Sequence, residues 1–175
     1  TIEAVRSYTC YNDLRLEVQM ADVTHSWNPT NGFDHVYFTV FFSIPGQPSL
    51  NELPQLGHSF EGFSFSRASL LYGWGSTHYT AIDATADSFG RPIPVRVKIE
   101  VHPQKTLVFT FPRAYFGKIK DLSGVRVLLT TWDGYLGHYH EVVPEPNEWR
   151  FSTRTEVDCN RVPKIFDYVL FPIEI

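Results

Sequence analysis

Aromatic side chains set among glycines and short polar residues are the part of this sequence with the clearest chemical potential. Trp74 lies between two glycines, and Trp132 is followed by an Asp-Gly pair, so both fall at expected loop positions. A flat aromatic ring can cover the apolar face of a sugar, while polar neighbours bond the sugar hydroxyl groups. We therefore predict a carbohydrate-binding site with stacking by Trp74, Trp132, Tyr135 and Tyr139 and hydrogen bonding by Asp133, His138 and His140.

The alternative for each of these rings is a structural role in the core or under a lid. Trp27, ahead of Asn28-Pro29, belongs to the same group of strand-end aromatics, whereas Trp149 stands in a pattern typical of a core position. Stacking on a sugar requires a ring that is open to solvent. The solvent exposure of the tryptophan rings therefore decides between the two interpretations.

Two segments carry residue types that bind metal ions. Asn28, Asn31 and Asp34 offer the oxygen ligands that calcium prefers, in a turn-rich loop without the EF-hand spacing. We predict a structural calcium site there, with turn-forming hydrogen bonds as the alternative. His138 and His140 would project to one side of an extended segment and suit zinc or copper, but the sequence has no third ligand at a diagnostic spacing. A solvated loop is the favoured interpretation of that pair.

Sequence patterns for catalysis are weak. The chain has no Gly-x-Ser-x-Gly motif, and Ser76 has no feature of an activated nucleophile. Carboxylates such as Asp133 and Glu141 are no more numerous than in any β-protein of this size, so they do not single out a glycosidase pair. We predict that the chain is a non-catalytic domain.

The composition restricts the class of partner. The 175 residues include 15 Lys+Arg and 19 Asp+Glu, for a net charge of -4. The charge balance argues against binding to nucleic acid, because the sequence has no Lys/Arg-rich patch to neutralise phosphates. Charged residues at 19% and hydrophobic residues at 43% exclude intrinsic disorder. No stretch approaches the roughly 20 apolar residues of a membrane-spanning helix.

An apolar period of two runs through most of the chain and predicts strands at Leu14–Met20, His35–Ser43, Val95–Val101, Leu107–Phe111 and Val125–Leu129. Helical signals are confined to about one turn at Arg113–Lys118 and a weaker one between Leu50 and Gly57. Short strands separated by Pro, Gly, Asn and Asp predict an all-β fold. We expect an antiparallel, jelly-roll-like β-sandwich that forms a single domain over residues 1–175.

The two cysteines lie near opposite ends of the chain, at Cys10 and Cys159. Terminal strands are neighbours in many sandwiches, so one alternative is a Cys10–Cys159 disulfide in an oxidising compartment. Closing so long a loop would stabilise the fold by about 4–5 kcal/mol in the chain-entropy model. The other alternative is a pair of free thiols.

Several motifs together resemble the C-terminal module of bacterial glucodextranases and α-amylase-superfamily enzymes. The most specific is Trp27-Asn28-Pro29 followed by Asn31-Gly32-Phe33-Asp34. The resemblance runs from about Asn12 to Val169 and includes Gly73-Trp74, the Val95–Phe111 hairpin, the Pro112–Gly117 turn, Thr130–Gly134 and Trp149–Phe151. The sequence departs from the family at Ser152–Thr155, which replaces a glycine-rich stretch, and it lacks the family's acidic, Gly/Pro-rich opening.

The resemblance implies a module similar to family-nine carbohydrate-binding modules, non-catalytic and attached to a secreted glycoside hydrolase. It implies binding to an α-glucan, a monomeric module, and a secreted, periplasmic or cell-surface location in a bacterium. Related modules bind calcium, so calcium at Asn28, Asn31 and Asp34 is the expected cofactor. The start at Thr1, without an initiator methionine, fits a module of a longer protein. The alternative is a structural or cell-surface attachment domain without a sugar site.

Overall fold

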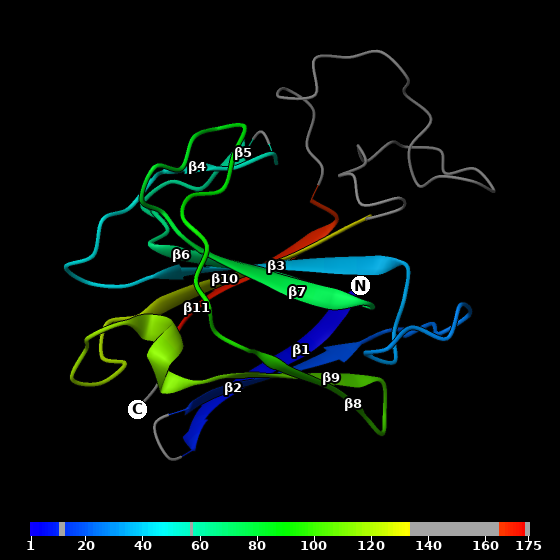
Figure 1. The fold of residues 1–175 in the computed structure, drawn as a ribbon. Coiled ribbons are helices and arrows are strands. Elements are labelled where there is room, and N and C mark those ends of the chain that lie inside the picture. The colour runs from blue at the N-terminus through cyan, green and yellow to red at the C-terminus, as the bar shows by residue number, and fades with distance from the viewer. Residues whose placement is uncertain (11–12, 57, 134–164, 174–175) are drawn as a thin grey trace, which may run out of the picture.

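Two antiparallel sheets face each other across an apolar core in the computed structural model of the chain, which describes residues 1–10, 13–56, 58–133 and 165–173 (Figure 1). The four-stranded sheet has the order β1-β2-β9-β8, with bounds Ile2–Cys10, Asp13–Met20, Thr106–Phe111 and Lys98–His102. The five-stranded sheet has the order β11-β10-β3-β6-β7, with bounds Asp167–Pro172, Arg126–Asp133, Val36–Ser43, Arg67–Tyr72 and Gly75–Thr80. A short ladder joins β4 (Glu52–Leu53) to β5 (His58–Ser59). The predicted all-β, antiparallel sandwich is confirmed.

The predicted alternation of apolar residues determines which side chains fill the space between the sheets. Every second residue of β2, from Leu14 to Met20, is buried, and the residues between them are half-buried. The central strand β3 is buried on both faces: Phe42 belongs to the main core, and Phe41 to a second cluster. The rings of Phe42, Phe111 and Tyr115 meet edge to face at centroid distances of 4.9–5.3 Å. Aromatic packing therefore holds the two sheets together.

Of the two predicted helical turns, the first forms and the second does not. The 3-10 helix η1 (Arg113–Phe116) follows Pro112 and ends at Gly117, whose φ of 75° suits glycine. The turn predicted between Leu50 and Gly57 is wrong, because its start joins β-structure. The amide of Leu50 donates to the carbonyl of Phe65 at 3.0 Å, and β4 pairs with β5. Cross-strand pairing thus replaces the local hydrogen bonds of a helix.

Two strand boundaries also differ from the prediction. The strand expected from Val95 begins only at Lys98: the Val95 amide donates locally to the carbonyl of Ile93 at 2.9 Å, and the chain approaches β8 as an irregular segment. In the opposite direction, β10 extends beyond Leu129 to Asp133 and pairs with β3 over its whole length. This extension places Trp132 within a strand rather than in a loop.

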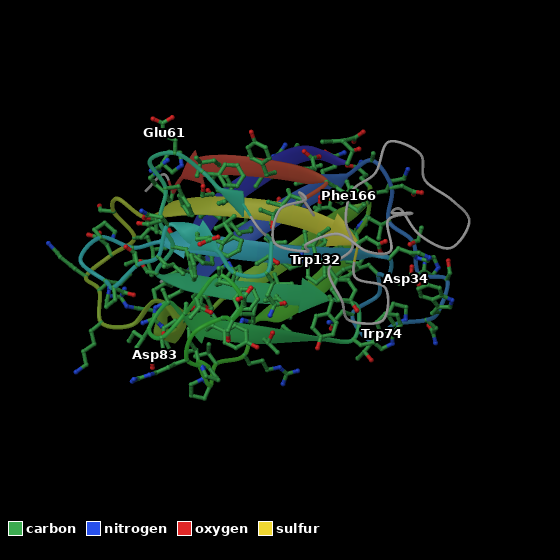
Figure 2. The ribbon with its side chains drawn as sticks, turned by 90° about the horizontal axis from the view of Figure 1, so that it is seen from above. Asp34, Glu61, Trp74, Asp83, Trp132 and Phe166 are labelled. Atoms are coloured by element: carbon green, nitrogen blue, oxygen red, sulfur yellow. The ribbon has the colours of Figure 1, made fainter. Side chains whose placement is uncertain are left out.

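A hydrogen bond joins the first strand of the chain to the last. The amide of Ile2 in β1 donates to a carboxylate oxygen of Asp167 in β11 at 2.8 Å and so links the two sheets. Figure 2 shows Asp34 and Trp74 at one end of the sandwich and Glu61 and Asp83 at the other.

None of the helical segments that the structure describes is long and apolar enough to cross a membrane.

Candidate functional site

Two exposed indole rings lie side by side at the end of the sandwich that carries Asp34. Trp27, in the loop between β2 and β3, is 54% exposed, and Trp74, between β6 and β7, is 47% exposed. Their ring centroids are 6.4 Å apart and their planes differ by 30°. The imidazole of His35 stacks on Trp27 at 4.3 Å. We call Trp27, Trp74 and His35 the aromatic platform.

Trp74 is presented by a tight hairpin whose shape depends on glycine. Tyr72 pairs with Gly75 across the β6–β7 ladder, so Gly73 and Trp74 form the whole connection. A Cβ atom at Gly73 would lie 2.1 Å from the carbonyl oxygen of Phe33 in the neighbouring loop. The absence of a side chain at Gly73 therefore lets the hairpin approach the loop that carries Trp27.

Asp34 organises the loop that presents Trp27. Its buried carboxylate accepts hydrogen bonds from the Thr24 hydroxyl at 2.5 Å, the Trp27 amide at 2.8 Å and the His35 Nδ1 at 2.5 Å. Burial alone would raise the pKa of Asp34, but these three hydrogen bonds outweigh it and hold the pKa below its ordinary value of 3.8. The charged carboxylate of Asp34 therefore holds the Trp27 amide and the His35 ring close to each other.

Two non-glycine residues of the same loop have left-handed backbone conformations, Asn28 at φ 52° and His35 at φ 66°. Such conformations are uncommon outside glycine and persist where the surrounding contacts hold them. At His35, these contacts are the hydrogen bonds to Asp34 and Thr24 and the stack on Trp27. The loop is therefore built around a specific placement of the two rings.

The prediction that Trp132 presents its ring to solvent is wrong. Its side chain is 1% exposed, its Nε1 donates to the Thr39 hydroxyl at 2.8 Å, and its ring meets Tyr37 edge to face at 4.8 Å. β10 extends as far as Asp133 and so pairs Trp132 with Tyr37 of β3. Asp133, the next residue, is also buried. Of the predicted stacking residues, only Trp74 is both described and exposed.

The remaining predicted sugar-binding residues, Tyr135, His138, Tyr139 and His140, lie outside the described residues, as does Trp149. The structure adds to the candidate site two residues that the sequence prediction did not include, Trp27 and His35. The signal for Trp27 was its place before Asn28-Pro29 in a turn-rich loop, which favours an exposed ring. No sequence pattern indicated that His35 stacks on it, because that contact depends on the fold of the loop.

The loop residues predicted to bind calcium take part in hydrogen bonds of the alternative, turn-forming kind. Both carboxylate oxygens of Asp34 already accept hydrogen bonds, and the Asn31 side-chain amide donates to backbone carbonyls. Calcium needs about six to eight oxygen ligands, so a calcium ion at this loop would have to compete with these hydrogen bonds. Within the described residues, no group of three or more His, Cys, Asp or Glu side chains could hold a metal ion.

Calcium binding by the chain as a whole stays a prediction, and it has a direct test. A site at this loop would raise the melting temperature in calcium over that in chelator, and the Asp34→Asn substitution would abolish the difference. Because the hydrogen bonds of Asp34 compete with a metal ion, we expect any calcium-dependent rise in melting temperature to persist in Asp34→Asn.

The predicted disulfide involves one described residue. Cys10 is exposed at the end of β1. Cys159 lies outside the described residues, so the pairing stays a prediction.

A known family of binding modules matches nearly the whole chain. A family model described as the C-terminal binding module, SLH-like, of glucodextranase matches residues 2–173. No curated protein matches the chain. The family match spans the two sheets and both loops of the aromatic platform, and it confirms the resemblance seen in the sequence. The chain therefore belongs to the family of C-terminal, SLH-like binding modules of glucodextranase.

Proposed function

We propose that this module binds an α-glucan through the aromatic platform and holds an attached glycoside hydrolase on its substrate. The observation that carries the proposal is the pair of exposed indoles, Trp27 and Trp74, held side by side by two different loops. Neighbouring exposed aromatic rings form an apolar surface of the kind that marks binding sites, and sugar rings match their flat faces. The family of binding modules to which the chain belongs supports the same function.

The site also carries polar groups that suit sugar hydroxyls. His35 lies against Trp27, and its side chain is 37% exposed. Asp133 ends β10 opposite Val36, the residue after His35, at the same end of the sandwich, but it is buried and is no longer part of the proposal. We include in the proposal Tyr135, His138, Tyr139 and His140, which follow Asp133 closely in the sequence. Trp132 is no longer part of it, because its ring is buried.

The proposal extends to the biology that the family implies. Modules of this family belong to glucodextranases, and the resemblance implies attachment to secreted enzymes, so we propose a secreted, periplasmic or cell-surface location and a monomeric module within a longer enzyme. The module itself contributes binding and no catalysis. Affinity should be modest, because rings on a wet surface lose part of their gain to the ordering of ligand and side chains.

Substitution of the platform rings tests the proposal. In native gels that contain amylose, pullulan or dextran, the wild-type module should migrate more slowly than in plain gels. Trp27→Ala and Trp74→Ala should each weaken this retention by about tenfold or more, since each removes a central stacking surface.

The matched control is Tyr8→Ala, which removes an exposed aromatic ring from the outer face of the four-stranded sheet. Tyr8 pairs with Arg15, near the start of β2, whereas the Trp27 loop follows the end of β2 at Met20. Retention should survive this substitution. Wild-type migration that is unchanged in all three gels would reject sugar binding and leave the structural or attachment domain as the function.

A further inference from the structure

We infer that Asn31 is the positioning residue that holds Trp27 and Trp74 together as one rigid unit. The inference rests on the proposed function for its ligand, and it concerns the same site. The two indoles come from segments more than 40 positions apart in the sequence, so their distance depends on contacts between the two segments. Asn31 supplies hydrogen bonds across that junction.

The contacts of Asn31 span the complete turn that presents Trp74. Its side-chain Nδ2 donates to the carbonyl of Tyr72 at 2.8 Å and approaches that of Gly75 at 3.5 Å. Its backbone amide donates to the carbonyl of Gly73 at 2.7 Å. One residue thus contacts the carbonyls on both sides of Trp74. Gly73 lies inside the two-residue turn and outside the β6–β7 ladder, so the Asn31 amide satisfies a carbonyl that the ladder does not use.

Hydrogen bonds also hold the loop that carries Trp27 and Asn31. Asn31 lies between Trp27 and Asp34, and Asp34 accepts the Trp27 amide at 2.8 Å. The carbonyl of Pro29 accepts the amide of Gly32 at 3.0 Å, so the residues on either side of Asn31 form a closed turn. A change of the Asn31 side chain would remove its bonds to Tyr72 and Gly75 and loosen the Trp74 hairpin on the Trp27 loop, while the backbone bond to Gly73 and both rings remain.

The chain offers a matched control at the other end of β3. Gln47 also uses a side-chain amide to join two segments: its Nε2 donates to the carbonyl of Phe116 at 2.8 Å, and its Oε1 accepts from Arg67 at 3.0 Å. Gln47 follows β3, whereas Asn31 precedes it, so the two clamps lie at opposite ends of that strand. Gln47→Ala removes comparable hydrogen bonds away from the aromatic platform.

A ligand-independent measurement tests the inference. Two indoles in close contact couple their electronic transitions. The changes in near-ultraviolet circular dichroism caused by Trp27→Phe and by Trp74→Phe should therefore not sum to the change in the double variant. We expect this non-additivity to disappear in Asn31→Ala and in the isosteric Asn31→Asp, whose carboxylate cannot donate to carbonyls. Gln47→Ala should retain it. Thermal melting of each variant confirms that the fold is intact.

The gel assay then tests whether the relative position of Trp27 and Trp74 affects binding to the glucan. Asn31→Ala and Asn31→Asp should lose about fivefold to tenfold in retention, because separated rings must be ordered again on the ligand, while Gln47→Ala keeps the wild-type retention. Coupling that persists in both Asn31 variants would overturn the inference, whatever the gels show. Wild type that is not retained in any gel would overturn the proposed function, while loss of coupling in the Asn31 variants would still support the positioning role.

Discussion

Replacing Gly73 with alanine should destabilise the protein by about 2–3 kcal/mol and abolish retention in α-glucan gels. The added Cβ would lie 2.1 Å from the carbonyl oxygen of Phe33 and 3.0 Å from the Cβ of Pro29. The first of these atoms belongs to the backbone, so no side-chain rotation relieves the overlap. The hairpin and the Trp27 loop must move apart, which separates Trp74 from Trp27 and breaks the hydrogen bonds of Asn31.

Urea unfolding measures the stability part of this prediction, and gel retention measures the binding part. Gly75→Ala, in the same hairpin, is the matched control. Its Cβ would approach the hydroxyl of Tyr72 at 3.1 Å, which is the far end of a side chain that can shift. We expect a smaller loss of stability in this variant. Equal stability of Gly73→Ala and wild type would contradict the close approach of the two segments.

A second large effect is expected on acidification, because the core contains a buried histidine. His78 of β7 is 6% exposed, and its Nδ1 and Nε2 lie 2.7 Å and 3.0 Å from the hydroxyls of Ser69 and Ser76. Ser69 in turn donates to the hydroxyl of Tyr115 at 2.7 Å. Neutral hydroxyls can satisfy a neutral imidazole but do not compensate a buried positive charge. Burial therefore lowers the pKa of His78 from 6.5 to about 4.

The sign of the stability change follows from this pKa. Between pH 6.5 and about 4 the unfolded chain binds a proton at His78 that the folded protein does not, so stability falls as the pH falls. A shift of this size corresponds to about 3 kcal/mol once the pH is below both pKa values. The contribution of Asp34 belongs to a separate window, since its pKa is lowered and its stabilisation disappears only as the pH falls below its ordinary 3.8.

Unfolding free energies measured by urea across this pH range test the prediction. His78→Gln keeps a neutral polar side chain and should flatten the slope between pH 6.5 and 4. His102→Gln is the control, because the side chain of His102 is 38% exposed on β8 and its substitution should leave the slope in place. A slope that persists unchanged in His78→Gln would show that another group is responsible.

The sequence by itself determined the layers and the core of this protein. Alternation at Leu14–Met20 and the apolar run at Val36–Ser43 depend on a side-chain period of two, which any strand must follow, so both were predicted correctly. The turn at Arg113–Phe116 was also local, because Pro112 and Gly117 mark its two ends. The family was evident from local motifs for the same reason.

Only the tertiary structure decided which aromatic rings reach solvent. Trp74 and Trp132 both have a glycine close by in the sequence, yet β10 pairs with β3 as far as Asp133, and the Trp132 ring is buried against Thr39 and Tyr37 of β3. Trp27 became part of the site because Asp34 and Asn31 carry its loop to a hairpin that is distant in the chain. Local sequence records the preference of a residue for strand or turn, whereas exposure and proximity depend on which distant segments pack together.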